Sequence, residues 1–558
     1  MVDTIQIFCK NTGNYVDVRG GETLLEIYER LKNEIPLRPI CAHVNNKTEG
    51  LTYPVFKPKV VDFIDEKTPS GQRMYVRSLC MVLAKAVRDL FPDDGLRIEH
   101  SISKGYFCSL KRQEELVEET VAAIRRRMEE IISSDMPFVR HVKLASDVTE
   151  MFRQEGMSDK VQLLETSSEL YAAYYCLDGF IDSYYGDLVP STGYLRVFDL
   201  QKYKNGMLLL PPDFAGDCRV PAKMIPQEKL FKAFTDYIRF NGIVGVSNVG
   251  ELNKIVEKRS NVDMLINVAE TLHDKIIGRI ADEITERYHE GGARVVLVAG
   301  PSSSGKTTTT KRLSIHLLAN LIKPQMISLD NYFVDREHTP RDEHGEYDYE
   351  SLYALDIEQF NKDLNALIRG EKVAMPTYDF ATGKRVYKGD TLQLTDNSIL
   401  LMEGIHGLNP ELTKSIPEKQ KFKVYVSALT TLSIDDHNWV PTTDNRLLRR
   451  IIRDYKYRGI SALDTITRWP SVRRGEEKWI FPYQENADAM FNSSLIFELG
   501  VMKDFAEPLL KKVPHNVPEY AEAHRLLNFL GCFREIGNRQ VPSTSLLREF
   551  LGGSSFKY

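Results

Sequence analysis

The sequence has few cysteines, and none of them has the spacing of a known metal site. There are seven in 558 residues, an odd number, and no two of them form a CxxC pair. This scatter argues against both a disulfide framework and a zinc site, so we expect reduced thiols that mostly pack in the interior. The seven are Cys9, Cys41, Cys80, Cys108, Cys176, Cys218 and Cys532.

Long apolar runs and an excess of positive charge are also missing. No run approaches the roughly 18 apolar residues of a membrane-spanning helix, and the start MVDTIQIFCK has no basic stretch followed by an apolar core. The formal net charge is −5, and residues 1–215 show no strong basic patch, so we do not expect nucleic acid as a partner. The expectation is a cytoplasmic protein without a membrane partner.

The length exceeds what one hydrophobic core usually serves, so we expect several domains. Residues 1–65 alternate like strands and then open a helix, which predicts a small β-grasp domain. Residues 66–225 predict an α+β domain, and 226–290 a helical connector. From 291–513 strands alternate with helices, which predicts an α/β fold with a parallel, helix-flanked sheet. A helical tail, 514–558, completes the chain.

A glycine-rich run between an apolar strand and an amphipathic helix predicts a phosphate-binding loop. Such a turn directs several backbone N–H groups and the positive end of the helix at one point. Lys306 adds a full charge for the terminal phosphates, and the Thr307 hydroxyl suits Mg²⁺. The sequence thus predicts ATP with Mg²⁺. The expected nucleotide-binding residues are Gly300, Ser302, Ser303, Ser304, Gly305, Lys306, Thr307 and Thr308.

The residues after the loop favour a kinase over a GTPase. The only downstream Asn-Lys pair, at 361–362, does not fit the guanine-reading NKxD pattern. A kinase needs a carboxylate that accepts the proton of the attacking hydroxyl. Asp330 follows the strand QMISL and is the predicted base, because ligands of open parallel sheets bind at the carboxyl ends of the strands. Glu403 ends the strand ILLM and is the predicted partner of Mg²⁺ or its water.

Four arginines lie three or four residues apart on a predicted helix and should share one face. Planar guanidinium groups suit the charge that spreads over a transferring phosphoryl group. A solvated basic face is the alternative, but the neighbouring phosphate loop favours a lid that closes over the phosphates. The four are Arg446, Arg449, Arg450 and Arg453.

Together these segments resemble the uridine kinase and phosphoribulokinase family over about residues 294–503. The shared segments are GPSSSGKTT, Asp330-Asn331-Tyr332, Tyr347-Asp348, Pro376-Thr377-Tyr378-Asp379-Phe380, LMEG at 401–404 and RRIIRD at 449–454. The resemblance implies Asp330 as general base and Asp348 as the ligand of ribose hydroxyls. It also implies a base pocket lined by Tyr378 and Phe380, with Arg450 and Arg453 on substrate and phosphates.

Two positions depart from that family. Gly383 stands where uridine-cytidine kinases place a histidine that hydrogen-bonds the pyrimidine, and Ile460 replaces a lid arginine. A pocket that selects by hydrogen bonding loses its reading group at Gly383. Kinase chemistry is therefore better supported than uridine as the acceptor.

The front half, about residues 1–215, resembles the TGS domain and the second additional domain of threonyl-tRNA synthetases. The resemblance rests on segments such as Gly20-Gly21-Glu22-Thr23-Leu24 and Val189-Pro190-Ser191-Thr192. In those enzymes the second domain edits mischarged tRNA with an HxxxH pair and a Cys/His pair. The corresponding positions here are Arg77, Met81, Tyr184 and Leu188. Because imidazole and thiolate are missing, we expect neither editing nor a metal there.

These observations predict an ATP-dependent kinase that phosphorylates the 5′-hydroxyl of a nucleoside, with a non-editing front half that regulates or scaffolds it. Two alternatives stay open: a kinase of another small hydroxyl substrate such as a sugar phosphate, and an RNA- or ribosome-associated regulator that switches with nucleotide. The base accepted, and any assembly into a homo-oligomer, stay open as well.

Overall fold

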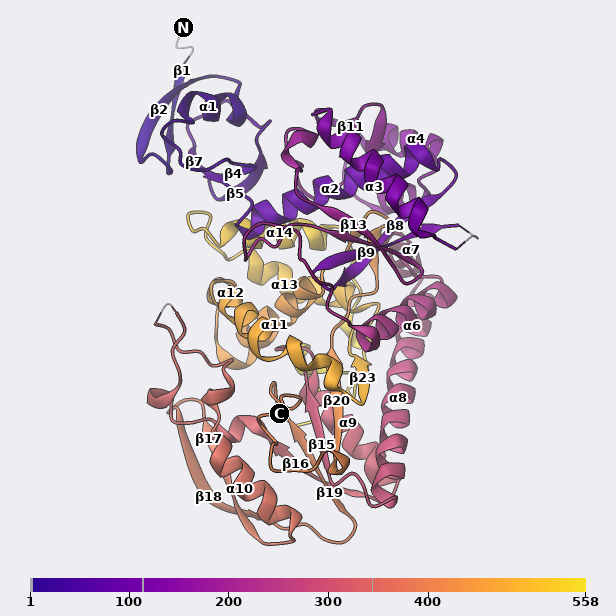
Figure 1. The fold of residues 1–558 in the computed structure, drawn as a ribbon, viewed down its shortest axis with the longest axis vertical. Helices are drawn as coiled ribbons and strands as arrows, with labels where there is room; N and C mark the ends of the chain where they lie inside the picture. Colours follow the sequence, from indigo (N-terminus) through magenta and orange to yellow (C-terminus); the bar gives the residue numbers. More distant parts are fainter. Residues whose placement is uncertain (1–3, 113–114, 344, 558) are drawn as a thin grey trace.

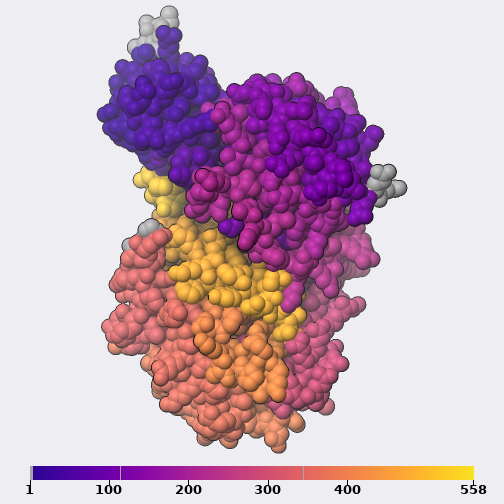
Figure 2. All heavy atoms as spheres, viewed as in Figure 1, coloured from indigo at the N-terminus to yellow at the C-terminus, as the bar shows by residue number. Residues whose placement is uncertain are grey.

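The computed structural model describes residues 4–112, 115–343 and 345–557. Figure 1 shows an elongated molecule, with the N-terminal modules at one end and the kinase sheet at the other. The end of the chain returns to the kinase, and Figure 2 shows late residues, in yellow, between the front half and the kinase surface. None of the described helices is long and apolar enough to cross a membrane.

The first module is a five-stranded sheet packed against one helix. The helix α1 (Leu24–Leu31) begins with a capping box, in which Thr23 and Glu26 each accept a hydrogen bond from the other's backbone N–H. Its apolar face packs on the sheet through Leu24 and Ile27, which are fully buried. The sheet order is β2 (Asn14–Arg19), β1 (Thr4–Cys9), β7 (Val60–Ile64), β4 (Cys41–Val44) and β5 (Lys47–Gly50), beside the short pair β3 (Glu22–Thr23) and β6 (Pro54–Val55).

The second module has two antiparallel sheets around a central buried helix, α2 (Pro69–Leu90). Pro69 stands at the first turn of α2, where its missing N–H costs nothing, and Thr68 caps the helix. One sheet has the order β13 (Asp199–Tyr203), β14 (Gly206–Leu210), β9 (Gly105–Lys111) and β8 (Gly95–Ile102). The other has the order β10 (Val139–Leu144), β11 (Tyr171–Leu177) and β12 (Phe180–Asp182). The remaining helices are α3 (Glu118–Ser133), α4 (Ala145–Gln154) and α5 (Ser158–Thr166).

A buried ion cluster joins the second module to the kinase. The Lys160 ammonium on α5 lies 2.8 Å from Asp182 and 3.1 Å from Asp435, and all three side chains are at most 2% exposed. His437 adds a contact of 2.8 Å to Asp182. Because Asp435 and His437 belong to the kinase half of the chain, this cluster fixes how the two halves sit together.

The connector consists of α6 (Glu228–Val244), α7 (Val249–Val256) and α8 (Arg259–His289). Its apolar positions recur every three or four residues, and Leu265, Ile277 and Ile284 are at most 3% exposed. These side chains share one hydrophobic core with the kinase and with the tail. The domain boundaries placed at 65, 225, 290 and 513 stay predictions.

The kinase is a parallel sheet flanked by helices, which confirms the predicted α/β fold. The strand order is β16 (Lys323–Ser328), β19 (Ser398–Glu403), β15 (Val295–Ala299), β20 (Lys421–Ser427) and β23 (Ala489–Asn492), and every pairing is parallel. β15, β19 and β20 are buried on both faces, and β15 and β19 accordingly contain the continuous apolar runs VVLVA and ILLM. The carboxyl ends of these strands meet at one edge, where ligands of such sheets bind.

The helices around this sheet are α9 (Lys306–Ala319), α10 (Ile357–Ile368), α11 (Thr442–Arg458), α12 (Ala462–Trp479) and α13 (Glu498–Leu510). Two hairpins project from it: β17 (Val373–Asp379) with β18 (Lys384–Leu392), and β21 (Ser433–Asp435) with β22 (Asn438–Trp439). The tail carries α14 (Tyr520–Gly531), which contacts β5 of the first module, and α15 (Arg548–Leu551), which contacts α11. The last segment therefore reaches the kinase site.

Candidate active site

The phosphate loop follows β15, the central strand of the kinase sheet, and leads into α9. Gly300 has to be glycine because an added Cβ would lie 1.9 Å from the carbonyl oxygen of Val426. Ser303 and Gly305 have φ angles of 59° and 84°, so the backbone curls and its N–H groups converge. The first-turn amides of α9 and the helix dipole complete an anion cradle. This geometry supports the predicted phosphate role of the residues at 300 and 302–308.

Two buried arginines of α11 hold the loop from outside. Arg446 donates from Nε to the Ser302 carbonyl at 2.9 Å and pairs with Glu476, which itself accepts from the Ser302 N–H at 3.1 Å. Arg449 pairs with Glu498, and both arginines are at most 1% exposed. The four predicted lid arginines therefore fall into two pairs with different roles. Arg446 and Arg449 are fixed in ion pairs that shape the loop, so they are not free to close over a substrate.

The other two arginines lie closer to the reacting centre. Arg450 donates from Nη1 to the Ser302 hydroxyl at 2.9 Å, and Arg453 lies beside Asp454 at 2.9 Å. Burial raises the pKa of the Asp330 carboxyl, and the positive charge of Arg453 opposes that rise. Both guanidinium groups thus adjoin the loop and the predicted base, which supports the role expected for them.

Lys306, Thr307, Asp330 and Glu403 converge at the edge of the sheet. The Lys306 ammonium donates to the Pro301 carbonyl at 3.1 Å, and the Thr307 hydroxyl donates to Glu403 at 3.3 Å. Burial raises the pKa of Glu403 to about 7, and the nearby charge of Asp330 adds to that rise. Burial also raises the pKa of Asp330, although the Lys306 charge opposes it. Two carboxyls of raised pKa beside a lysine are typical of a catalytic centre.

The predicted acceptor pocket is an aromatic cluster beside that centre. The rings of Tyr378 and Phe380 lie 5.1 Å apart, and Phe333 lies 5.5 Å from Tyr378. Asn331, directly after the predicted base, accepts from the Tyr378 N–H at 3.4 Å, which ties the cluster to the catalytic strand. Phe380 is 60% exposed, so an incoming flat ring has a free face to stack on.

Asp348, the predicted ribose ligand, is half-buried in the segment between β16 and α10. Its backbone N–H donates to Pro340 at 2.8 Å, and its carbonyl accepts from Ser351 at 3.2 Å. This turn precedes Glu350, a carboxylate that motif reading missed. Burial and the nearby Glu476 raise the pKa of Glu350 to about 7, while Lys306 and Arg450 oppose the rise.

The structure gives a physical reason for Gly383. This residue closes the turn between β17 and β18 with φ of 70°, and an added Cβ would lie 2.8 Å from the Cβ of Arg336. Arg336 donates to the Phe380 carbonyl at 2.6 Å. Burial raises the pKa of Tyr378, and the Arg336 charge opposes that rise. A cation therefore lies beside the acceptor pocket, near the position where related kinases carry the pyrimidine-reading histidine.

The tail places a carboxylate on the phosphate loop. Glu549 of α15 accepts from the Thr308 N–H at 3.1 Å and from the Thr308 hydroxyl at 2.7 Å. Leu546 lies so close to Gly305 that an added Cβ there would be 2.5 Å from it. No sequence pattern indicated this contact, because it joins residues 241 positions apart.

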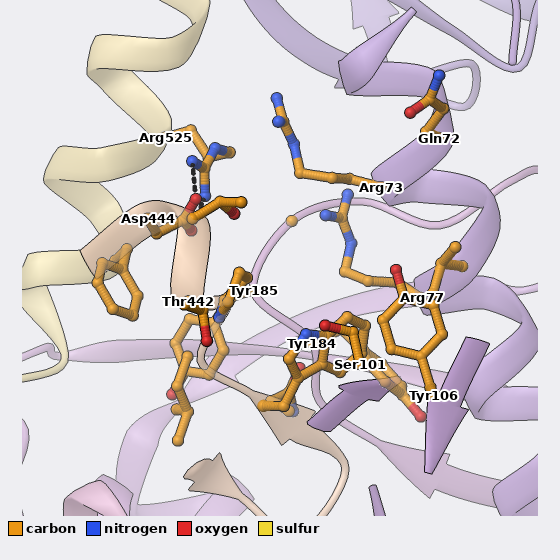
Figure 3. A pocket seen from close by; sticks show the side chains of 18 of the residues that line it. Gln72, Arg73, Arg77, Ser101, Tyr106, Tyr184, Tyr185, Thr442, Asp444 and Arg525 are labelled. Carbon is orange, nitrogen blue, oxygen red and sulfur yellow. Dashed lines mark hydrogen bonds and ion pairs between the residues drawn. The ribbon is translucent and has the colours of Figure 1, made fainter. Parts of the chain in front are cut away.

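The four positions that replace the editing ligands are held in the second module. Met81 and Leu188 are at most 4% exposed and pack in its core, together with Tyr184. Arg77, one turn before Met81 on α2, faces the cavity drawn in Figure 3. None of the four side chains is a thiolate or an imidazole, so the donor set does not fit zinc.

The donors at the phosphate loop fit ATP and Mg²⁺. Backbone amides, one lysine and nearby arginines suit a triphosphate. The Thr307 hydroxyl and Glu403 supply the oxygen ligands that Mg²⁺ prefers, directly or through water.

Comparison with known proteins agrees with this geometry. Residues 295–496 match the family model described as phosphoribulokinase / uridine kinase family. A uridine kinase of Staphylococcus aureus (strain JH9) is 30% identical over 195 residues, which are 35% of this chain and 84% of that enzyme. A possible uridine kinase from Bacillus stearothermophilus, a solved structure, aligns with 22% identity and a TM-score of 0.26, covering 38% of this chain and 98% of that one.

The front half has a relative of another kind. A threonine–tRNA ligase of Carboxydothermus hydrogenoformans is 28% identical over 179 residues, which are 32% of this chain. The chain spans only 28% of the length of that ligase. The P-loop kinase, with its catalytic edge formed by β15, β16 and β19, is thus joined to a ligase-like front half. The chain belongs to the phosphoribulokinase / uridine kinase family.

Proposed function

We propose that the protein transfers the γ-phosphate of ATP to the 5′-hydroxyl of a nucleoside. The observation that carries this proposal is the placement of Asp330 between the Lys306 end of the phosphate loop and the aromatic cluster of Tyr378 and Phe380. A base at that point reaches both a phosphate on the loop and a hydroxyl of a ring-bearing acceptor.

In this proposal Lys306 and the loop amides bind the β- and γ-phosphates, and Asp330 accepts the proton of the attacking hydroxyl. Arg450 and Arg453 stabilise the charge that develops on the transferring group. Asp348 orients the ribose. Mg²⁺, when bound near Thr307 and Glu403, neutralises phosphate charge.

A panel of acceptors with ATP, scored by ADP release, tests this function. The panel contains pyrimidine nucleosides, purine nucleosides and sugar phosphates, because Gly383 removes the group that would select a pyrimidine. Release of ADP that depends on a nucleoside, with the phosphate recovered on the 5′-oxygen, is the expected result. Failure of every nucleoside would overturn the proposal.

Arg336 favours one alternative acceptor. Its guanidinium lies beside the acceptor pocket, and guanidinium groups bind phosphate oxygens in bidentate fashion. A sugar phosphate that is turned over more efficiently than any nucleoside, and that loses this advantage in Arg336→Gln, would establish the alternative.

We also propose that the front half regulates the kinase and does not edit tRNA. The buried cluster of Lys160, Asp182 and Asp435 gives the two halves a common, rigid contact. With a net charge of −5 and no strong basic patch in residues 1–215, binding to RNA should be weak. Tight RNA binding without acceptor-dependent ADP release would favour the nucleotide-switch alternative instead.

A further inference from the structure

A large cavity lies between the front half and the kinase; Arg446, which holds the phosphate loop, lines it, but residues 300–308 do not. Its volume is about 1620 Å³. Arg73 and Arg77 of α2 and Tyr184 line it from the front half, while Thr442 and Asp444 line it from the first turn of α11. Figure 3 shows the two α2 arginines side by side, across the space from Arg525 of the tail.

Arg77 is a cation that lacks an anionic partner. No carboxylate oxygen of the described residues lies within ion-pair distance of it; its Nη2 donates to the backbone carbonyl of Asp187 at 2.9 Å. Its Nε is buried and has no hydrogen-bond partner. Burial, together with the charge of Arg73 one turn away, lowers the pKa of Arg77 to about 10. Arg77 is partly buried, and a partly desolvated charge without an ion-pair partner is costly unless something compensates it.

The nearest acid, Asp187, compensates that charge only in part, because burial still lowers the pKa of Arg77. The Asp187 carboxylate already accepts from the Gly50 N–H at 2.7 Å and from the Tyr175 hydroxyl at 2.9 Å. Burial raises the pKa of Glu49, which also lines the cavity, to about 7, so part of it is uncharged at neutral pH. Arg77 therefore faces a space in which an incoming anion meets little repulsion.

The rest of the cavity suits a flat ring. Tyr106 of β9 and Trp439 of β22 line it and lie 4.5 Å apart between ring centroids. Aromatic faces of this kind stack on bases. A pair of arginines on successive turns of a helix presents two forks to the oxygens of one phosphate.

The cavity is also connected to the kinase site. Arg73 pairs with Glu522 at 2.9 Å, Glu522 pairs with Arg525, and Arg525 holds Asp444 with contacts of 2.7 and 2.9 Å. Asp444 lies in the first turn of α11, the helix whose later turns hold the phosphate loop through Arg446. An anion that draws Arg73 away from Glu522 would act on this chain of ion pairs.

We propose that this cavity is a second nucleotide site, in which the phosphate of a mononucleotide binds between Arg73 and Arg77 and its base lies against Tyr106 and Trp439. Occupation of this site changes the kinase through the ion pairs that end at Asp444. The site requires neither Lys306 nor Asp330.

Calorimetric titration of the full chain with uridine, cytidine, adenosine and guanosine monophosphates tests the site. The titrations are repeated in Lys306→Ala, which removes the main cation of the phosphate loop. We expect at least one mononucleotide to bind with the same affinity in both proteins. Arg77→Ala should weaken that binding about tenfold or more, in keeping with the loss of a charge-assisted hydrogen bond. Arg126→Ala, an exposed arginine of α3, is the matched control.

A second measurement separates the site from a purely structural role of Arg77. Arg77→Met should raise the melting temperature, because it removes a partly desolvated charge that has no ion-pair partner. The bound mononucleotide should also shift the KM for ATP in the wild type and not in Arg77→Met. Any one of four results would overturn the proposal. Two of them are the absence of binding up to about 1 mM and equal binding in Arg77→Ala. The other two are loss of binding in Lys306→Ala and binding of inorganic phosphate as tight as that of any nucleotide.

Discussion

At the scale of single residues, proton acceptance depends on a carboxylate that is partly desolvated and yet lies close to a lysine. Burial raises the pKa of Asp330, which makes the carboxylate more basic, and the charge of Lys306 opposes that rise. Asp330→Asn keeps the shape and removes the base. We expect kcat to fall at least about a hundredfold with little change in melting temperature, as measured by ADP release and by calorimetry. Near-normal turnover would show that another group accepts the proton.

A second residue-scale prediction concerns Glu549, which accepts two hydrogen bonds from Thr308 at the amino end of α9. Since phosphate is attracted to the same N–H groups, this carboxylate competes with the nucleotide. Glu549→Gln should therefore lower the KM for ATP about threefold or more, which is about 0.7 kcal/mol. Glu535→Gln, an exposed acid of the same tail, is the control. An increase in KM would mean that Glu549 assists nucleotide binding.

Some of these residues could be predicted from sequence and others could not, for a physical reason. Asp330 and Glu403 each follow an apolar strand, and the topology of a parallel sheet brings strand ends together. Arg336 lies in a short 3-10 helix (Arg336–His338) and Glu350 in a turn, and segments this short carry no periodic signal. Glu549 comes from a segment whose position depends on packing against α11.

At the scale of elements, α11 acts as a support for the phosphate loop. Arg449 is fully buried, and its guanidinium pairs with Glu498 and also donates to the Ser493 carbonyl at 2.9 Å. Arg449→Met should lower the free energy of unfolding by about 3–5 kcal/mol, because it leaves Glu498 buried without its partner. Urea unfolding measures this loss. The double variant Arg449→Met/Glu498→Leu should recover most of it, and a double variant as unstable as the single one would contradict the explanation.

The same elements show where helix patterns mislead. The spacing of the arginines correctly predicted a helix, now α11 (Thr442–Arg458). Spacing alone could not distinguish arginines that face solvent from those buried in ion pairs, because the partners Glu476 and Glu498 lie on α12 and α13, outside the predicted helix. The strands QMISL and ILLM, expected from the sequence, appear as β16 and β19, whereas the short edge strand β23 was not anticipated.

At the scale of the whole molecule, the contact between the halves depends on protonation. Contact with Asp182 raises the pKa of His437 above its ordinary value, and burial raises the pKa of Asp435 to about 6. Both groups bind more protons in the folded state, so their contribution to stability is full at acidic pH and is lost as the pH rises through their folded pKa values. His437→Gln should therefore weaken the fall in melting temperature between about pH 6 and 8.

Scanning calorimetry at several pH values measures that slope. His289→Gln, an exposed histidine at the end of α8, is the control and should leave it unchanged. An unaltered slope in His437→Gln would show that other groups carry the pH dependence, among them Glu350 and Glu403, whose pKa values are also raised to about 7.

The contact between Glu549 and the phosphate loop also sets an order of events during translation. Thr308 leaves the ribosome 241 residues before the acid that binds it. A nascent kinase therefore meets cellular nucleotide with its loop uncovered, and only afterwards does α15 arrive and compete.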